Sequence, residues 1–344
     1  MPSGSPFEQP FPAFAYSQSR WTTFQRCPRA YYLRVYEAWR GWAAPSGSAS
    51  WLAYRLKRAT SVPAFIGSVM HDVLTTTVRT LVHDAVLPSQ DGMLHTARAA
   101  LNTAWQSARR TAPSYFDPAV SPRGIMLEEF LYGNEPTGAA LQRNRDRVAF
   151  LVETLWHCDS LWEQVRAADA TQVIVPAPFG SLVWSEPRLI AGPVTLFAAP
   201  DLVLQSGTDT PLTITDLKTG RSDGVIDQLL TYGVALADGL LPSLSVGPTM
   251  EGQIVALGDG DRAISRCGIN AEDLVGTRSQ LVANINVLAG QLQHPRGAAP
   301  LAKEAFRMRT DLRNCAACVF RGQCHPGFYP LTIPGAPQGT QTPA

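Results

Sequence analysis

Four short segments with strand character follow one another from about residue 171 to residue 220, and they constrain the fold more than any other feature of the sequence. The segments are QVIVPAPF, SLVWSEPRLI, PVTLFAAPDLVLQ and LTITDLKTG, with turn-forming residues between them. Segments with helical periodicity precede them, at 67–87, 92–112 and 137–168, and VIDQLLTYGVALADGLL follows them. The next segment, GQIVALGDGDRAISRC, predicts a hairpin across its Gly-Asp-Gly-Asp turn. This order predicts an α/β fold in which a central mixed sheet, with strands within about 181–267, is flanked by helices.

The last of these segments, LTITDLKTG at 212–220, carries an aspartate and a lysine two residues apart. Side chains at i and i+2 of a strand share a face, so Asp216 and Lys218 should lie together, in line with Leu212 and Ile214. The chain has 29 basic residues and only three are lysines, which suggests that a compact ammonium group is needed here. The triplet alone is explained more simply by a surface ion pair worth under about 1 kcal/mol.

A second aspartate favours a functional site over a surface ion pair. Asp201 lies fifteen residues before Asp216, in the preceding strand candidate. The turn SGTDTP should pair the two strands as a hairpin, which brings both carboxylates to one end of the sheet. Oxygen ligands of this kind suit Mg²⁺ or Mn²⁺, with the backbone carbonyl of Leu217 and the carboxylate of Glu186 as further candidates. Lys218 would then stabilise the negative charge that a phosphodiester gains during hydrolysis.

Composition sets broad limits on the class of protein. The chain has 344 residues, of which 45% are hydrophobic and 17% charged, as expected for a packed globular protein. No apolar run is long enough to span a bilayer, and the N-terminus does not resemble a signal peptide, so a cytoplasmic protein without a membrane partner is expected. The net charge of +1 neither favours nor excludes a nucleic-acid partner.

Three of the six cysteines form a C-x2-C-x5-C pattern in CAACVFRGQC, at Cys315, Cys318 and Cys324. In a cytosolic chain this spacing indicates metal binding rather than disulfides. The adjacent His325 would complete a zinc site of three cysteines and one histidine, although neighbouring ligands are awkward for one tetrahedral ion. Ser17 or Ser19 can cap a first helix, and Cys27 before Pro28 predicts an elbow between that helix and a second one. Cys158 and Cys267 fit buried thiols.

Several motifs together resemble the PD-(D/E)XK nuclease superfamily. Pro200-Asp201 followed by Asp216-Leu217-Lys218 matches its defining pattern. SQSRWTTFQRCPRAYYLRVY is similar to the N-terminal helix of RecB/AddB-type nucleases and of iron–sulfur CRISPR adaptation nucleases, GSVMHDVL to their G-x-x-x-H element, DQLLTY to their Q-x3-Y helix, and CAACVFRGQC to their cysteine cluster. The motifs occur in the family's order. Only the helical segment at about 88–170 has no counterpart.

The resemblance implies a restriction-endonuclease-like core and assigns roles to residues. His71 would join Asp201 and Asp216 at the catalytic metal ion, and Lys218 would act on the water and the transition state. Gln228 and Tyr232 would contact the DNA backbone or order the lysine. Cys27 would be the fourth ligand, with Cys315, Cys318 and Cys324, of a [4Fe–4S] cluster that clasps the two ends of the chain. Arg20 matches the family's S-x-S-R element and would line a DNA path. Arg26, Arg29 and Arg34 would either extend this path or form a solvated helix face.

The expected function is therefore a metal-dependent deoxyribonuclease, an exonuclease on single-stranded DNA or DNA ends. DNA repair, recombination, CRISPR adaptation and phage defence all remain open, and a helicase partner would supply unwinding. The alternative is a catalytically weak DNA-binding or scaffold subunit that carries zinc. The expected regions are a helical segment at 1–66, a nuclease core at 67–292 with the insertion at about 88–170, a cysteine segment at 293–325, and a disordered tail at 326–344.

Overall fold

The computed structural model describes residues 9–120, 124–168, 173–174, 180–205, 210–220, 225–240, 250–258, 263–309, 311–333 and 335. The strand expected at 172–179 lies outside these ranges except for residues 173–174. Parts of the turns that join the two expected hairpins, at 206–209 and 259–262, also lie outside the described residues.

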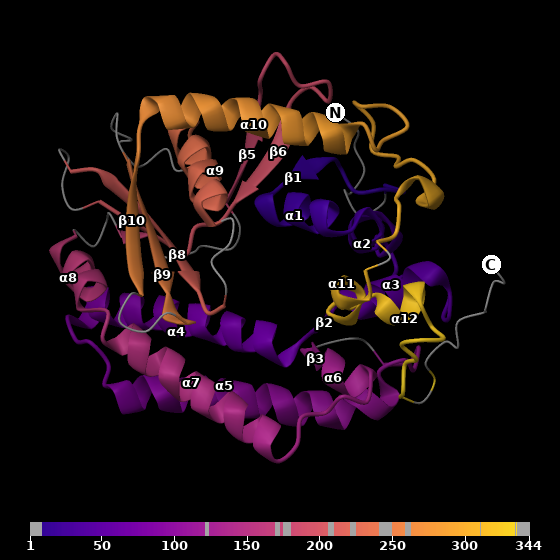
Figure 1. The fold of residues 1–344 in the computed structure, drawn as a ribbon, viewed down its shortest axis with the longest axis horizontal. Helices are drawn as coiled ribbons and strands as arrows, with labels where there is room; N and C mark the ends of the chain where they lie inside the picture. The colour runs from indigo at the N-terminus through magenta and orange to yellow at the C-terminus, as the bar shows by residue number, and fades with distance from the viewer. Residues whose placement is uncertain are drawn as a thin grey trace.

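The described structure contains a mixed five-stranded sheet that is flanked by helices (Figure 1), as the strand pattern predicts. Its order is β10-β9-β8-β7-β4, and only β8 and β9 run parallel. The strands are β4 (Val173–Ile174), β7 (Leu202–Leu204), β8 (Leu212–Lys218), β9 (Met250–Ala256) and β10 (Ile264–Ile269). Both hairpins are confirmed, because β7 pairs antiparallel with β8 and β9 antiparallel with β10.

A second, three-stranded sheet corrects the prediction of a single central sheet. It has the order β1-β6-β5, with β1 (Ala15–Tyr16), β5 (Gly180–Trp184) and β6 (Val194–Ala198). The segment PVTLFAAPDLVLQ is thus two strands in two sheets, β6 and β7, interrupted around Pro200, which has no N–H to donate to a ladder. Strand β1 pairs parallel with β6, so the N-terminal segment contributes to the sheet structure.

The N-terminal helices follow the predicted pattern. They are α1 (Gln18–Arg26), α2 (Pro28–Tyr32), the π-helical turn η2 (Leu33–Glu37) and α3 (Ala49–Lys57). Ser17 caps α1, since its side chain accepts a hydrogen bond from the backbone of Arg20. Cys27 has extended backbone angles between α1 and α2, and Pro28 opens α2. The predicted elbow at Cys27 is therefore confirmed.

The middle of the chain is helical, as predicted, with one break that periodicity does not reveal. Its elements are α4 (Val62–Asp84), α5 (Gln90–Thr111), the 3-10 turn η3 (Ala112–Ser114), α6 (Glu128–Leu131), α7 (Ala139–Trp156) and α8 (Asp159–Ala167), with a small parallel pair of β2 (Ala59–Thr60) and β3 (Met126–Leu127). The helix expected at 137–168 is two helices, α7 and α8, which meet at His157 and Cys158.

The remaining helices are α9 (Val225–Ala237), α10 (Ala271–Ala289), the 3-10 turn η6 (Lys303–Ala305), α11 (Leu312–Ala316) and α12 (Arg321–Cys324). Two apolar cores cover the two faces of the five-stranded sheet. Ile214 belongs to the core shared with α9, α10 and the N-terminal aromatic residues, whereas Leu217 belongs to the core shared with α4, α7 and α8. The strand β8 is consequently buried on both sides, and its polar end is enclosed by both groups of helices.

The segment after the cysteines differs from the expected disordered tail. The backbone N–H of Thr332 donates to the carbonyl of Leu131 at 2.9 Å, and Ile333 packs against the core next to α6. Residues 326–333 are thus ordered against the helical insertion, while residues 336–344 lie outside the described ranges. No helix among the described residues is long and apolar enough to cross a membrane.

Candidate active site

The β7–β8 hairpin positions the two aspartates. Asp201 lies in the bend just before β7, and its carboxylate Oδ2 accepts a hydrogen bond from the backbone N–H of Leu217 at 2.7 Å. Its own N–H donates to the carbonyl of Thr215 at 3.2 Å. The backbone of β8 therefore fixes the Asp201 side chain beside Asp216, which is the convergence that the hairpin predicts.

Helix α4 adds His71 to this end of the sheet. The Nδ1 atom of His71 lies 2.7 Å from Oδ1 of Asp201. Gly67, one helical turn before His71, allows this approach, because a Cβ atom there would lie only 3.1 Å from Oγ1 of Thr219. The G-x-x-x-H spacing thus has a local physical reason: the glycine lets α4 lie against the end of β8 where the histidine reaches the aspartate.

Lys218 connects the aspartates to α9. Its ammonium Nζ lies 2.6 Å from Oδ2 of Asp216 and donates to Oε1 of Gln228 at 3.0 Å. The amide of Gln228 in turn donates to the hydroxyl of Tyr232. Asp216, Lys218, Gln228 and Tyr232 therefore form one continuous polar chain from β8 to α9. Asp216 is only 2% exposed, whereas Lys218 is 24% exposed and Gln228 is also partly exposed.

The electrostatics of this group favour a bound cation. Burial raises the pKa of Asp216 from 3.8 to about 6; the Lys218 ammonium opposes this rise and the Asp201 charge adds to it. Burial alone would lower the pKa of His71, but the hydrogen bond and negative charge of Asp201 outweigh it, and the pKa of His71 is raised. Burial, followed by the negative charge of Asp216, raises the pKa of Tyr232.

The donor atoms present match a hard divalent cation in chemistry. Asp201 and Asp216 offer carboxylate oxygens and His71 an imidazole, and two neighbouring carboxylates in a buried position are stabilised by positive charge. Across the residues that the structure describes, no group of three or more His, Cys, Asp or Glu side chains is already arranged to hold a metal ion. Leu217 was expected to offer its backbone carbonyl as a further ligand. Its backbone N–H donates a hydrogen bond to the Asp201 carboxylate.

Glu186 does not join this group. Its carboxylate accepts from Nε of Arg188 at 2.8 Å, and it lines a surface hollow with Asp238 and Arg278. Asp238 follows the C-terminal end of α9, whereas Gln228 lies in its first turn, and ten helical residues span about 15 Å. The expectation that Glu186 adds a carboxylate to the aspartate site is therefore not supported by its position.

The four cysteines expected to bind one cluster line a single cavity of about 230 Å³, although Cys27 is 288 to 297 residues from the others in sequence. His325 lines the same cavity, and its Nε2 lies 3.8 Å from Sγ of Cys315. Burial raises the pKa of Cys324 to about 12 and also raises the pKa of Cys318.

The other two cysteines do not line that cavity, and the expectation of a buried thiol is met by Cys158, whereas Cys267 is only partly buried. The Sγ of Cys158 donates to the carbonyl of Thr154 at 3.2 Å, and burial raises the pKa of Cys158 to about 11. The Sγ of Cys267 approaches the carbonyl of Gly252 at 3.6 Å. Each of these two thiols thus contacts a backbone carbonyl of the fold.

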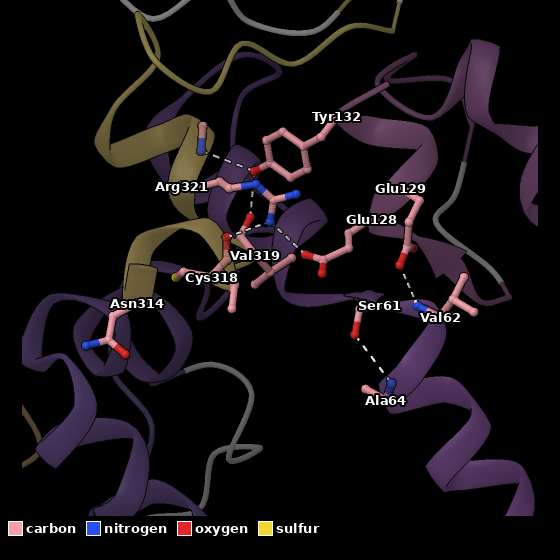
Figure 2. A network of polar contacts seen from close by, with 12 residues as sticks. Ser61, Val62, Ala64, Glu128, Glu129, Tyr132, Asn314, Cys318, Val319 and Arg321 are labelled. Atoms are coloured by element: carbon pink, nitrogen blue, oxygen red, sulfur yellow. Dashed lines mark hydrogen bonds and ion pairs between the residues drawn. The ribbon is translucent and has the colours of Figure 1, made fainter. Parts of the chain in front are cut away.

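Protein contacts hold the cysteine segment in place. Arg321 of α12, which is 5% exposed, contacts Glu128 at 3.0 Å and the carbonyl of Cys318 at 3.0 Å, and its guanidinium lies 3.6 Å from the Tyr132 ring centre (Figure 2). The Tyr132 hydroxyl donates to the carbonyl of Val319 at 2.7 Å. The helical insertion thereby anchors the segment between Cys318 and Cys324.

Sequence reasoning missed two contacts with Thr219, the residue that follows β8. Arg147 of α7 donates to the carbonyl of Thr219 at 2.8 Å, directly after Lys218, and no local pattern marks it. Gly67 was present in the G-x-x-x-H element, but its contact with Thr219 could not be foreseen. The helical insertion therefore contacts the end of the strand that carries the lysine.

A mixed sheet that presents two aspartates and a lysine at the end of one hairpin, backed by a histidine-bearing helix, is the arrangement of phosphodiester-hydrolysing α/β nucleases. A family model of the PD-(D/E)XK nuclease superfamily matches residues 15–325, and the chain belongs to this superfamily. No curated protein matches the chain. Members of the superfamily are nucleases that typically use Mg²⁺ or Mn²⁺, which gives this chain a nucleic-acid substrate class.

Proposed function

We propose that the chain is a Mg²⁺- or Mn²⁺-dependent deoxyribonuclease that acts as an exonuclease on single-stranded DNA or DNA ends. The single observation that carries this proposal is the contact between Lys218 and the buried Asp216, beside the His71–Asp201 pair. A surface ion pair, the simpler explanation of the sequence triplet, would be exposed, but Asp216 is 2% exposed. Family membership supports the same chemistry.

In this proposal Asp201 and Asp216 hold the divalent cation, with the Leu217 carbonyl and His71 as further ligands. When bound, the cation supplies positive charge that stabilises the phosphoryl group in the transition state. Lys218 donates a hydrogen bond to the negative charge that develops on the phosphodiester, or orients the attacking water. Its partial exposure beside a buried carboxylate suits a group that must meet substrate.

Gln228 and Tyr232 have a positioning role in this scheme. Gln228 accepts from the Lys218 ammonium and donates to Tyr232, so the amide fixes where the lysine points. Tyr232 is 6% exposed and its raised pKa keeps it protonated at neutral pH, so it remains a neutral phenol beside the aspartates. A direct contact of Gln228 with the DNA backbone remains part of the proposal.

The test is digestion of 5′- and 3′-labelled DNA, single- and double-stranded, with Mg²⁺, Mn²⁺ or EDTA. Metal-dependent release of short products from one end is expected, and Lys218→Met should lower the rate by about 10²–10³-fold. Lys303→Met is the matched control, because Lys303 is paired with Glu37 elsewhere. No cleavage by the unaltered protein would support the alternative of a DNA-binding or scaffold subunit, and full activity of Lys218→Met would contradict a catalytic role of Lys218. Cleavage of circular single strands would contradict the exonuclease assignment.

We further propose that Cys27, Cys315, Cys318 and Cys324 bind a [4Fe–4S] cluster, because all four line one cavity. His325 lies close to Cys315, so a zinc ion bound by His325 and the three C-terminal cysteines is the competing proposal. Iron, sulfide and zinc analysis of anaerobically purified protein separates the two. Loss of iron in Cys27→Ser but not in Cys158→Ser supports the cluster, whereas zinc that is lost in His325→Ala supports the alternative.

The RecB/AddB-like motifs support a role in DNA repair, recombination, CRISPR adaptation or phage defence, in the cytoplasm and with a helicase partner. These are proposals that rest on the order of the motifs around the matched region. Co-purification of the tagged full chain from its native cells tests them: a helicase subunit supports repair or recombination, and CRISPR adaptation proteins support adaptation.

A further inference from the structure

A pocket of about 170 Å³ lies between α4, α5 and α7, and we call it the insertion pocket because α5 and α7 belong to the helical insertion. Its floor is apolar and buried, and consists of Val62, Phe65, Ile66, Leu127 and Val148. Trp105 of α5 forms part of the wall; it is partly exposed, and its ring centre lies 4.9 Å from that of Phe130. Pockets for drug-sized ligands measure about 300–1,000 Å³, so this smaller pocket suits a single flat ring system.

Four polar side chains surround this apolar floor, in two pairs on two packed helices. Arg98 and Asn102 lie one turn apart on α5, and Asn144 and Arg145 are neighbours on α7. Asn144 is partly exposed and the other three are exposed. Among the residues that the structure describes, none of the four side chains forms an ion pair or a hydrogen bond. Their guanidinium and amide groups are therefore available to a ligand.

The charge around the insertion pocket is of one sign. No carboxylate is among the described residues that line it, and Asp146, next to Arg145, accepts from the amide of Gln142 at 2.7 Å instead. Two guanidinium groups beside an apolar floor match an anion that is joined to an apolar ring, since arginine binds phosphate well. Asparagine amides both donate and accept, which matches the polar edge of a heterocyclic base. A nucleotide combines these parts.

The insertion pocket also lies beside the strand that carries Lys218. In Figure 1, α4 lies between the five-stranded sheet and the pair α5 and α7. Ile66 of the floor precedes Gly67, where an added Cβ atom would lie 3.1 Å from Oγ1 of Thr219. Arg147 of α7 donates to the carbonyl of Thr219 at 2.8 Å. Two of the helices that form the pocket thus contact the residue that follows Lys218, so a strand held at Lys218 extends along α7 to reach the pocket.

We infer that the insertion pocket binds one unpaired nucleotide of the DNA strand that is cleaved at Lys218. The base lies on the apolar floor beside Trp105, the two asparagine amides bind its polar edge, and the two arginines bind the flanking phosphates. This inference rests on the proposed function and adds to it a subsite in the insertion. A base that is paired in a duplex cannot enter the pocket, so the subsite makes the protein prefer single strands. Because every base has an aromatic face, the preference is independent of sequence.

The experiment asks whether binding depends on bases, and it does so without cleavage. Fluorescence anisotropy in EDTA compares a labelled thymidine oligonucleotide with an abasic deoxyribose-phosphate strand of the same length. The unaltered protein should bind the thymidine strand about 5–100-fold more tightly, which is the effect of stacking one base on an aromatic ring. Trp105→Leu keeps an apolar side chain and should lose most of this difference. Trp42→Leu, which removes an exposed tryptophan outside the pocket, should retain it.

A second variant keeps the test decisive if Trp105→Leu, whose ring contacts Phe130, does not fold. Asn102→Ala/Asn144→Ala changes only side chains without partners among the described residues, and it should also reduce the preference for the thymidine strand. Gln106→Ala/Gln142→Ala on the same two helices is the matched control and should retain the preference. A preference that is unchanged in Trp105→Leu, or in the asparagine variant where Trp105→Leu does not fold, would overturn the inference.

The phosphate contacts have a separate measurement. The slope of log K against log salt should fall in magnitude by about 1.4 in Arg98→Gln/Arg145→Gln, since each contact to a single strand contributes about 0.7. Arg109→Gln/Arg110→Gln removes the same charge from exposed positions of α5 outside the pocket and should leave the slope unchanged. Equal changes of the slope in the two double variants would overturn the assignment of the two arginines.

Other occupants of the insertion pocket predict different results. If thymidine monophosphate displaces the labelled strand at the same concentration as an unlabelled thymidine strand, the pocket binds free nucleotides and the assignment to the DNA strand is overturned. If the unaltered protein binds the thymidine and abasic strands equally, the pocket holds no base, and an acidic helix of a protein partner becomes the better occupant.

The outcome is separable from that of the proposed function. If the unaltered protein shows a Trp105-dependent preference for strands with bases but cleaves no DNA with either metal ion, the deoxyribonuclease proposal fails and the nucleotide site stands. If cleavage depends on Lys218 while all pocket variants bind as the unaltered protein does, the site is wrong and the nuclease proposal stands.

Discussion

The ammonium group of Lys218 lies 2.6 Å from the carboxylate of Asp216, on a strand that is buried on both faces. A buried carboxylate with one ammonium partner is still unfavourable when a second carboxylate, Asp201, adds negative charge. That is why the pKa of Asp216 is raised to about 6 even though Lys218 opposes the rise. A bound cation would offset this unfavourable burial of negative charge. Without a cation, the buried charge lowers the stability of the folded protein.

Asp216→Asn should stabilise the metal-free protein in a pH-dependent way. The folded-state pKa of Asp216 is about 6 against an ordinary value of 3.8, so the folded state binds the extra proton between these values and stability falls as pH rises through this window. The asparagine does not ionise, so the variant should gain up to about 3 kcal/mol at pH 7–8 and almost nothing near pH 4. Urea unfolding in EDTA from pH 4 to 8 measures this, and a difference that stays constant across that range would contradict it.

His71→Ala should weaken metal binding rather than abolish chemistry. The imidazole holds Asp201 at 2.7 Å, and loss of such a contact typically lowers metal affinity by about 10–100-fold. The Mn²⁺ concentration that gives half-maximal cleavage should rise by this factor, with activity recovering at high Mn²⁺. His83→Ala on the same helix, an exposed histidine beside Asp84, is the control and should behave as the unaltered protein. Unchanged Mn²⁺ dependence in His71→Ala would exclude a role at the metal.

Gly67→Val should reduce cleavage while leaving the chain folded. A Cβ atom added at Gly67 would lie 3.1 Å from Oγ1 of Thr219, so a branched side chain should push α4 away from the residue that follows Lys218. A displacement of about 1 Å can cost about 100-fold in rate. Gly276→Val, in α10 with no atom within 4 Å, is the matched control. Thr219→Ala should restore part of the activity of Gly67→Val, and absence of any rescue would show that the contact is not the cause.

Local signals explain the parts of the fold that the sequence could predict. Ser17, Cys27 and Pro28 determine the start of α1 and the elbow because caps and prolines act on their nearest neighbours. The two hairpins were predictable because short turns join adjacent strands. The convergence of Asp201 and Asp216 followed from one of these hairpins, so part of the candidate site was accessible from the sequence as well.

Contacts between distant segments explain the parts that could not be predicted. Nothing near Val194 indicates that β6 pairs with β1, some 180 residues earlier, and so leaves the sheet that β7 joins. Arg147 carries no motif, and its contact with the carbonyl of Thr219 exists only after α7 has packed against the end of β8. Glu186 had the right chemistry for a ligand, but the second sheet places it near the other end of α9.

Arg321→Met should destabilise the protein far more than loss of an exposed arginine. Arg321 and Glu128 are nearly buried, and removing one member leaves an uncompensated buried charge, which costs about 3–5 kcal/mol. Arg266→Met, from an exposed pair with Glu251 at 3.6 Å, is the control and should cost under about 1 kcal/mol. Glu128→Gln combined with Arg321→Met should cost less than the sum of the single changes. Urea unfolding gives these differences.

The same variant separates a structural role from a metal-binding role for the cysteine segment. Arg321 donates to the carbonyl of Cys318 and lines the cavity with Cys324, so its loss should loosen the three C-terminal thiols together. Metal content should fall in Arg321→Met although every cysteine is still present. If the metal content equals that of Arg266→Met while stability drops, the network of Figure 2 supports the fold without organising the thiols.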